Sequence, residues 1–304
     1  MGGRAVISVI MLTYNREKLI SRAIESILHQ AFYDFEFIIV DNGSTDKSGQ
    51  IADKYAQRDN RIQVIHRERG NIGAGRNTGL DVAQGDYITF IDDDDWTEPD
   101  FLEFLYKLSV ENDADVSICG TSDRIFDERF IMNAEDALIE LMWRKRYNAG
   151  FPTKLFRREL IQDLRFSELD KFDDIGLMYK LIADANRVVY HGLPKYHVVR
   201  HDQNNSNWTT NHSQLTGEVL DEYLEAYHNR TAWLSKRFPT HASVFRYFEW
   251  SFMISMIEKI NRLKIKDCKQ QLEDMKQKLT RHRTEFMNSP EILDFEKMWV
   301  EKYL

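Results

Sequence analysis

The stretch Phe90-Ile91-Asp92-Asp93-Asp94-Asp95-Trp96 places four adjacent carboxylates at the end of a run of strand-forming residues that begins at Tyr87. Two unit charges about 5 Å apart repel by roughly 3 kcal/mol at an effective dielectric constant near 20, so such a cluster needs a cation or solvent to offset the repulsion. Carboxylate oxygens suit Mg²⁺ or Mn²⁺ that also binds substrate phosphates. The alternative is a solvated acidic loop, and the sequence on either side of the run decides between the two.

Upstream of the acidic run, apolar segments alternate with segments of helical periodicity. Residues 6–12 are apolar without alternation, which is typical of a buried parallel strand. Further strands are predicted at residues 35–40, 62–65 and 87–91, and Asn15 is expected to cap the first helix. This βαβαβαβ order predicts an α/β fold with an open, mostly parallel sheet and helices on both faces.

Polar residues follow several of these strands. Tyr14 and Asn15 come after the first strand, Asp41 ends the second, and the acidic run follows the fourth. Ligands of open α/β sheets bind at the carboxyl ends of the strands, so these side chains predict one ligand site. The nearby glycine-rich loop, residues 70–79, suggests a nucleotide diphosphate. It has one residue too many between its last two glycines for a dinucleotide fingerprint, which argues against a Rossmann dehydrogenase.

The second half of the chain continues with mixed signals. Helices and strands are predicted, in order, at residues 101–108, 116–119, 133–143, 173–183, 188–190 and 196–199. From about residue 216 the pattern is helical only, which predicts a separate C-terminal helical region.

Composition limits the classes of protein that this chain can belong to. The 304 residues carry a net charge of −8, which argues against general nucleic-acid binding. No apolar run approaches the roughly 18 residues of a membrane span, and no signal-peptide pattern is seen. The two cysteines, Cys119 and Cys268, have no metal-type spacing. These features predict a cytoplasmic protein.

The motifs together resemble the family 2 inverting glycosyltransferases, which have the GT-A (nucleotide-diphospho-sugar transferase) fold. Residues 8–15, SVIMLTYN, are similar to the family's S-V-I-I-P-T-Y-N, and residues 37–46, FIIVDNGSTD, to its I-I-V-D-D-G-S-T-D. Residues 75–79, GRNTG, resemble A-R-N-x-G, and residues 90–96 resemble F-L-D-S-D-D-W. The resemblance is dense over residues 6–105. Leu12 in place of Pro and Asn42 in place of Asp are its two mild departures.

The resemblance implies contacts to a nucleotide-sugar donor. The residues that match the family's donor-binding positions are Thr13, Tyr14, Asn15, Asp41, Arg76, Asp92, Asp93 and Asp173. Asp41 is expected to meet the base or ribose, although a turn-initiating Asp before Asn-Gly also explains its presence. Arg76 is expected to meet the diphosphate or base, against the alternative of an exposed helix arginine. Asp94 is the first choice of metal ligand, with Asp92 for ribose and metal, whereas Asp93 is expected to be solvated.

Residues 172–180, FDDIGLMYK, resemble the family's Y-E-D-x-x-F-x-x-K segment, in which the second acid is the catalytic base. This makes Asp174 the base that removes the acceptor hydroxyl proton. The alternative is that both acids only favour the start of a helix. His201, five residues before Ser206, matches a family metal ligand or diphosphate contact, and Lys154 matches a segment near the acceptor site and is a candidate phosphate contact.

The resemblance therefore implies a glycosyltransferase dependent on Mn²⁺ or Mg²⁺ that moves a sugar, with a UDP-sugar favoured, to a saccharide or lipid-linked saccharide. Bacterial surface polysaccharide or capsule synthesis is the expected setting. A non-catalytic nucleotide-sugar-binding protein is one alternative. A sugar-phosphate nucleotidyltransferase is another, disfavoured because residues 13–16, TYNR, stand where its Gly-rich basic loop belongs.

The expected domains are residues 1–215, with the nucleotide sugar at 1–110 and the acceptor at 111–215, and a helical region at 216–304. The helical region combines an aromatic segment from Tyr247 to Ile257 with nine Lys or Arg and three Asp or Glu between Lys259 and Arg283. A helical cap or a homodimer interface explains the aromatic segment. Peripheral contact of residues 247–283 with the inner face of the plasma membrane is the sharper hypothesis.

Overall fold

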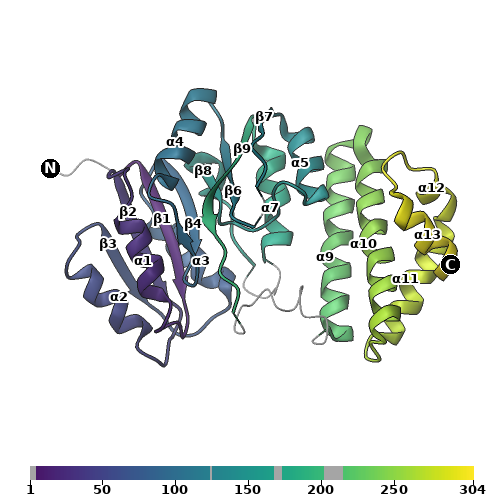
Figure 1. Ribbon diagram of the computed structural model, residues 1–304, viewed down its shortest axis with the longest axis horizontal. Helices are drawn as coiled ribbons and strands as arrows, with labels where there is room; N and C mark the ends of the chain where they lie inside the picture. Colours follow the sequence, from purple (N-terminus) through teal and green to yellow (C-terminus); the bar gives the residue numbers. More distant parts are fainter. Residues whose placement is uncertain (1–4, 124, 168–172, 202–214) are drawn as a thin grey trace. The chain divides into compact units, whose positions relative to one another are not determined.

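The computed structural model describes residues 5–123, 125–167, 173–201 and 215–304 (Figure 1). Within these residues the chain divides into two compact units, residues 1–199 and 200–304. The first unit contains a mixed sheet with the strand order β3-β2-β1-β4-β8-β6-β9-β5, in which β7 also pairs with β9. The second unit is helical.

The N-terminal half of the sheet is parallel, as the alternating apolar runs predict. Its strands are β1 (Ile7–Thr13), β2 (Phe35–Asp41), β3 (Ile62–His66) and β4 (Tyr87–Asp92). Thr13 pairs with Asp41, Asp41 pairs with His66, and Leu12 pairs with Asp92. Because the strands are parallel and in this register, the residues that follow them meet at one edge of the sheet.

Helices cover both faces of these strands, as predicted. Alternate residues of a strand point to opposite faces. Ile7, Val9 and Met11 share a buried cluster with the apolar residues of α1 (Ile20–Leu28) and α4 (Phe101–Asn112). On the other face α3 (Ile72–Val82) lies so close to β1 that a Cβ atom on Gly79 would be 2.5 Å from Ile10 Cγ2. α2 (Ser48–Ala56) packs on α1 and β3.

The first helix begins later than the sequence suggests. Asn15 does not cap it: α1 starts at Ile20 after Leu19, and Asn15 has a positive φ of 54°. The Asn15 side-chain oxygen instead accepts hydrogen bonds from the backbone of Thr45 (2.8 Å) and Asp46 (3.4 Å). The expected cap is therefore wrong, because this amide closes the loop after β2 rather than a helix end.

The other half of the sheet has more strands than predicted. β6 (Val116–Thr121) is found, and the two expected segments near residues 188 and 196 form the single strand β9 (Val188–His197). The short strands β5 (Trp96–Thr97), β7 (Arg129–Met132) and β8 (Lys154–Arg157) were not predicted. β8 runs antiparallel between β4 and β6 and so joins the two halves. The remaining helices of this unit are α5 (Ala134–Trp143), α6 (Arg158–Ile161) and α7 (Asp173–Asp184).

The second unit is the helical region expected at the C-terminal end. Its elements are α9 (Gly217–Arg237), the 3₁₀ turn η2 (Pro239–His241), α10 (Ala242–Leu263), α11 (Lys269–Arg281), α12 (Arg283–Met287) and α13 (Asp294–Tyr303). α9 and α10 run side by side, and α11 and α13 pack on α10 (Figure 1). In the part of the chain that is described, no helix is both long and apolar enough to cross a bilayer.

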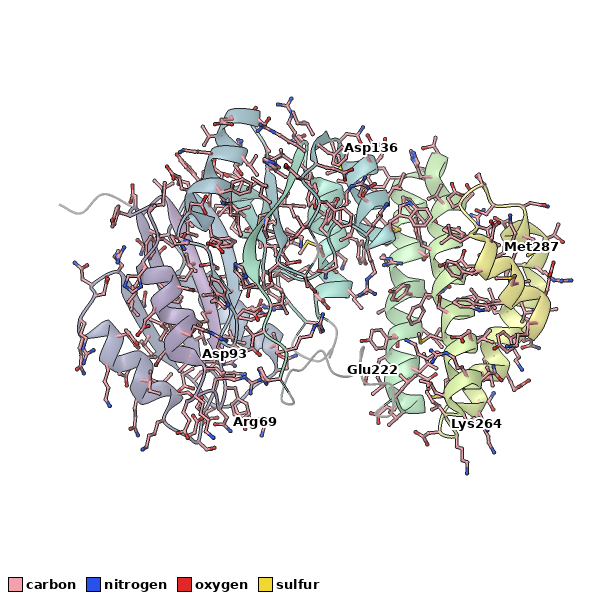
Figure 2. All side chains as sticks on the ribbon, viewed as in Figure 1. Arg69, Asp93, Asp136, Glu222, Lys264 and Met287 are labelled. Carbon is pink, nitrogen blue, oxygen red and sulfur yellow. The ribbon has the colours of Figure 1, made fainter. Side chains whose placement is uncertain are left out.

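The aromatic segment of α10 forms the core of this unit. Tyr247, Trp250, Ile254 and Ile257 are all buried. A hydrophobic segment that packs inside a helical unit is not available to enter a bilayer, so that part of the membrane hypothesis is wrong. The basic turn around Lys264, at the tip of α10 (Figure 2), is exposed. Membrane contact through residues 247–283 stays a prediction that depends on these exposed cations alone.

The contact between α3 and β1 can be tested with a glycine substitution. Gly79→Ala is expected to lower the free energy of unfolding by about 1–2 kcal/mol, because overpacking typically costs 1–3 kcal/mol and helix propensity returns up to about 1 kcal/mol. Gly176→Ala in α7 is the matched control, since among the described residues no atom outside the adjacent turns of α7 lies within 4 Å of its added Cβ. Urea unfolding followed by circular dichroism should show that the control is neutral or stabilising. Equal effects of the two substitutions would contradict the close approach.

Candidate active site

The acidic run lies at the carboxyl edge of β4, and most of it is buried. Asp93, Asp94 and Asp95 are 9%, 8% and 4% exposed, so a solvated acidic loop is excluded. In particular, the expectation that Asp93 is solvated is wrong. Asp92, Asp94 and Asp95 can each place a carboxylate oxygen so that the three atoms lie within 4.8 Å of one another. Three hard oxygen donors in this arrangement fit Mg²⁺ or Mn²⁺.

Crowding of these carboxylates disfavours their charged forms. Burial raises the pKa of Asp93 to about 7, and the nearby charge of Asp94 adds to the rise. Burial likewise raises the pKa of Asp95 to about 8, with repulsion from Asp92 as the second cause. A divalent cation among these groups would favour their ionised forms. The electrostatics of the run therefore fit a cation site.

Protein cations and backbone amides offset part of the repulsion. The Arg16 Nε lies 3.5 Å from Asp93 Oδ1 and 4.0 Å from Asp94 Oδ2. The Tyr14 backbone N–H donates to Asp93 Oδ2 (3.3 Å), and Arg22 Nη2 donates to the Asp94 carbonyl (2.6 Å). Neither arginine was singled out from the sequence. Arg16 could have been identified from the sequence, because it directly follows the T-Y-N motif.

The acidic run is also tied to β9, which lies far away in sequence. The Val199 N–H donates to Asp95 Oδ1 (2.7 Å), and the Asp92 N–H donates to the Tyr196 hydroxyl oxygen (3.1 Å). The Trp96 ring stacks on the His197 ring, with centroids 3.6 Å apart and planes 3° from parallel. These contacts fix the orientation of the acidic residues that follow β4.

A second group of side chains surrounds the end of β2. Asp41 is 6% exposed, and its Oδ1 accepts a hydrogen bond from the Ser44 N–H (3.0 Å). Asn42 bridges to the glycine-rich loop: its Nδ2 donates to the Gly70 carbonyl (2.8 Å) and its Oδ1 accepts from the Gly70 N–H (3.3 Å). An Asp at position 42 could not donate, so this departure from the family motif has a structural use.

Two of the residues expected to bind the donor lie against aromatic or cationic partners. The Arg69 guanidinium lies 4.6 Å from the centroid of the Tyr14 ring, and Figure 2 labels Arg69 and Asp93 at the same end of the parallel strands. The Arg76 guanidinium lies 5.1 Å from the Phe151 ring and 5.3 Å from the Phe166 ring. Arg76 is half-buried among these rings, which does not fit a freely exposed helix arginine.

Asp174, the expected base, lies at the start of α7. The alternative, that this acid only favours the start of the helix, predicts the same position. The Asp174 Oδ1 accepts a hydrogen bond from the Ile175 N–H (2.8 Å), and the side chain is half-buried. Asp173 is the first residue of α7. Ser206 and Phe172 lie outside the described residues. His201 belongs to the second unit, and its role as a metal ligand stays a prediction.

Lys154 does not fit the expected phosphate contact. It begins β8, is 0% exposed, and donates from Nζ to the Gly150 carbonyl (2.5 Å). Burial lowers the pKa of Lys154 to about 7, against the opposing effects of the Cys119 and Asp174 side chains. A fully enclosed amine bonded to a backbone carbonyl cannot meet an external phosphate, so this expectation is wrong.

Comparison with known proteins identifies the family. The model of glycosyl transferase family 2 matches residues 8–167, more than half of the chain. The chain belongs to this family. The glycosyltransferase GlyG of Streptococcus pneumoniae is 35% identical over 205 residues, which are 61% of this chain and 67% of GlyG. The putative glycosyltransferase EpsH of Bacillus subtilis is 33% identical over 206 residues, 63% of this chain and 60% of EpsH.

Solved structures share the fold over nearly the whole chain. Residues 1–349 of Staphylococcus aureus TarS in complex with UDP-GlcNAc superpose with a TM-score of 0.71 at 22% identity, covering 98% of this chain and 91% of that chain. The mannosyltransferase PcManGT of Pyrobaculum calidifontis, in complex with GDP-Man and Mn²⁺, gives a TM-score of 0.55 at 15% identity, covering 98% and 84%. The predicted GT-A fold is confirmed, and this family 2 chain is a glycosyltransferase.

The buried amine of Lys154 makes a prediction about stability. Its pKa is lowered in the fold, so between about pH 7 and the ordinary Lys value near 10.4 the unfolded chain binds more protons than the folded chain. Stability from this group therefore rises with pH across that window. Lys154→Met should raise the free energy of unfolding at neutral pH and remove this rise.

Urea unfolding at pH 7.5 and 9.5 measures both effects of Lys154→Met. The matched control is Lys107→Met on the exposed face of α4, where loss of the solvent-screened ion pair with Glu103 should change stability little at either pH. If Lys154→Met is less stable than the control at pH 7.5, the buried amine stabilises the fold and the prediction is wrong.

Proposed function

We propose that this glycosyltransferase is metal-dependent and inverting, and that it transfers a sugar from a UDP-sugar to a saccharide or lipid-linked saccharide. The observation that carries the proposal is the triad of half-buried Asp92 with buried Asp94 and Asp95 at the edge that also holds Asp41. A ligand that spans this edge would meet a cation at one end and a hydrogen-bond acceptor at the other. A nucleoside diphosphate has this layout, because its diphosphate suits the cation and its base or ribose can donate to Asp41.

The donor-side roles proposed here rest on the family motifs together with the positions of the groups. Asp92, Asp94 and Asp95 would hold Mn²⁺ or Mg²⁺, and the bound ion would supply positive charge to the departing diphosphate. Asp41 would accept from the base or ribose, beside the Tyr14 ring and the Asn15 loop. Arg76 adds positive charge to the donor side. Thr13, Asp93 and Asp173 complete the proposed donor contacts.

The acceptor-side chemistry requires a base. Inversion needs one group that removes the proton of the acceptor hydroxyl while its oxygen attacks the anomeric carbon opposite to the leaving diphosphate. Asp174 is proposed for this role. Its Oδ1 accepts a hydrogen bond from the Ile175 N–H, which holds the carboxylate at the start of α7.

The relatives support a UDP-sugar donor and a surface-polymer setting. The TarS structure contains UDP-GlcNAc, and the S. aureus protein of that name, poly(ribitol-phosphate) beta-N-acetylglucosaminyltransferase, is 30% identical over 190 residues. We infer a bacterial surface polysaccharide or capsule polymer as the acceptor. Location of the enzyme at the inner face of the plasma membrane stays a prediction, as does formation of a homodimer.

The base can be tested by an isosteric substitution. Asp174→Asn should lower the rate of sugar transfer by about 10²–10⁴-fold, because general base catalysis contributes that much. Binding of UDP should be unchanged. Asp184→Asn, an exposed acid at the other end of α7, is the control and should keep full activity. Release of UDP from UDP-sugars with a saccharide acceptor measures the rate, and wild-type turnover by Asp174→Asn would exclude this residue as the base.

The cation site can be tested without measuring activity. Asp94→Asn should weaken Mn²⁺ binding in the presence of UDP by at least about ten-fold, since even outer partners of metal ligands contribute 10–100-fold. Isothermal titration calorimetry or the Mn²⁺ electron paramagnetic resonance signal measures the affinity. Asp136→Asn on the exposed surface of α5 (Figure 2) is the control. Equal Mn²⁺ affinity of both variants would place the ion elsewhere, and EDTA should abolish transfer by the wild-type enzyme.

A further inference from the structure

A histidine outside the family motifs touches the carboxylate proposed to bind the nucleoside. His66 is the last residue of β3 and pairs in register with Asp41, the last residue of β2. Its Nδ1 lies 2.9 Å from Asp41 Oδ2, and its Nε2 lies 3.0 Å from Asp53 Oδ1 on α2. The imidazole therefore bridges two carboxylates that come from the two elements packed against β3.

The geometry of this bridge specifies the charge of the ring. A carboxylate only accepts hydrogen bonds, whereas a neutral imidazole has one donor nitrogen and one acceptor nitrogen. Both contacts of His66 are hydrogen bonds only when the ring is protonated. Asp41 and Asp53 are the charged groups that act on the ring, and their hydrogen bonds raise the pKa of His66 above its ordinary value of 6.5. The ring is 51% exposed, so it exchanges protons freely with solvent.

The surroundings leave Asp41 little freedom apart from this bridge. Ser44 N–H holds its Oδ1, and His66 holds its Oδ2. The backbone of Gly49 approaches this same Oδ2 so closely that an added Cβ would be 2.4 Å from it and 3.1 Å from His66 Cε1. A glycine at this position of α2 lets the carboxylate and the ring meet.

We propose that His66 is a positioning residue for donor binding: its protonated ring, anchored to α2 through Asp53, holds the Asp41 carboxylate oriented toward the base or ribose of the donor nucleotide. This inference rests on the proposed function, because it takes Asp41 as the nucleoside contact. His66 itself touches no part of the donor. Its effect is therefore on the nucleoside and not on the phosphates.

The protonation state of the His66 ring then changes the affinity for the donor nucleotide. Below about pH 6 the ring is charged and both carboxylates are bonded. As the pH rises through the pKa of His66, which lies above 6.5, one of the two hydrogen bonds is lost and Asp41 loses its adjacent positive charge. The contribution of His66 to donor affinity, and to folding stability, is thus present at low pH and declines above neutrality.

The test compares UMP and UDP binding to the full-length enzyme by isothermal titration calorimetry. At about pH 6, His66→Ala should weaken both nucleotides by the same factor of about five, which corresponds to ~1 kcal/mol, the size of one hydrogen bond. Gly49→Ala, which displaces the Asp41 carboxylate, should weaken both as well. His29→Ala, which removes an exposed imidazole at the end of α1, is the control and should change neither affinity.

Measurement across pH separates positioning from a merely structural role. The ratio of wild-type to His66→Ala affinity cancels the ionisation of the ligand itself, and it should fall at least about two-fold from pH 6 to pH 9. Asp53→Asn should move the midpoint of this fall to lower pH, because it removes one of the two carboxylates that raise the pKa of His66. Thermal unfolding of each variant shows whether the fold is retained.

Several results would overturn the inference. A ratio that is constant with pH would reduce His66 to a structural residue, and a larger effect on UDP than on UMP would mean that the ring acts on phosphate charge. If Asp41→Asn weakens UMP but His66→Ala does not, the inference fails while the proposed function stands. If the wild-type enzyme binds no uridine nucleotide, the proposed function fails first.

Discussion

Mutual repulsion of acids at the end of β4 is the constraint on which the site depends. Three consecutive carboxylates, Asp93 to Asp95, are buried there, although burial and proximity both disfavour their charge. The fold supplies partial compensation in the form of Arg16, the Tyr14 N–H and the Val199 N–H. The acids stay crowded at the sheet edge, and a divalent cation with its phosphate ligand is the species that would favour their ionised forms.

Other elements of the first unit bring further side chains close to this acidic run. Parallel register brings Asp41 and Asp92 to one edge, while α3 approaches β1 through glycines and so carries Arg76 past the same edge. β8 inserts antiparallel beside β4 and connects it to β6 and β9, from which Tyr196 reaches back to the acidic run. The parallel half of the sheet and the mixed second half are therefore one structure and not two appended modules.

The features that the sequence predicts are those with a local cause. Strands β1 to β4 follow from apolar runs, and their polar ends follow from parallel topology, so Asp41 and the acidic run could be placed on one edge in advance. The short strands β5, β7 and β8 have no periodicity to detect. Asn15 as a helix cap, Asp93 as a solvated acid and Lys154 as a phosphate contact were wrong, because each depends on tertiary structure. Asn15 binds the loop after β2, Asp93 lies at a buried sheet edge, and Lys154 is enclosed and bonded to the Gly150 carbonyl. The link from His66 to Asp41 required the strand register.

The bonds between the acidic run and β9 have a consequence for how the chain is made. Asp92 and Asp95 find their partners Tyr196 and Val199 only 104 residues later. At a synthesis rate of about 5–20 residues per second, the ribosome delivers those partners roughly 5–20 s after the acids. During that interval the carboxylates are best left hydrated, because burying them alone costs several kcal/mol. Strands β1 to β4 of the nascent chain can therefore pair early. The acidic run after β4 can reach its final hydrogen bonding only after the end of β9 and Val199 have been synthesised.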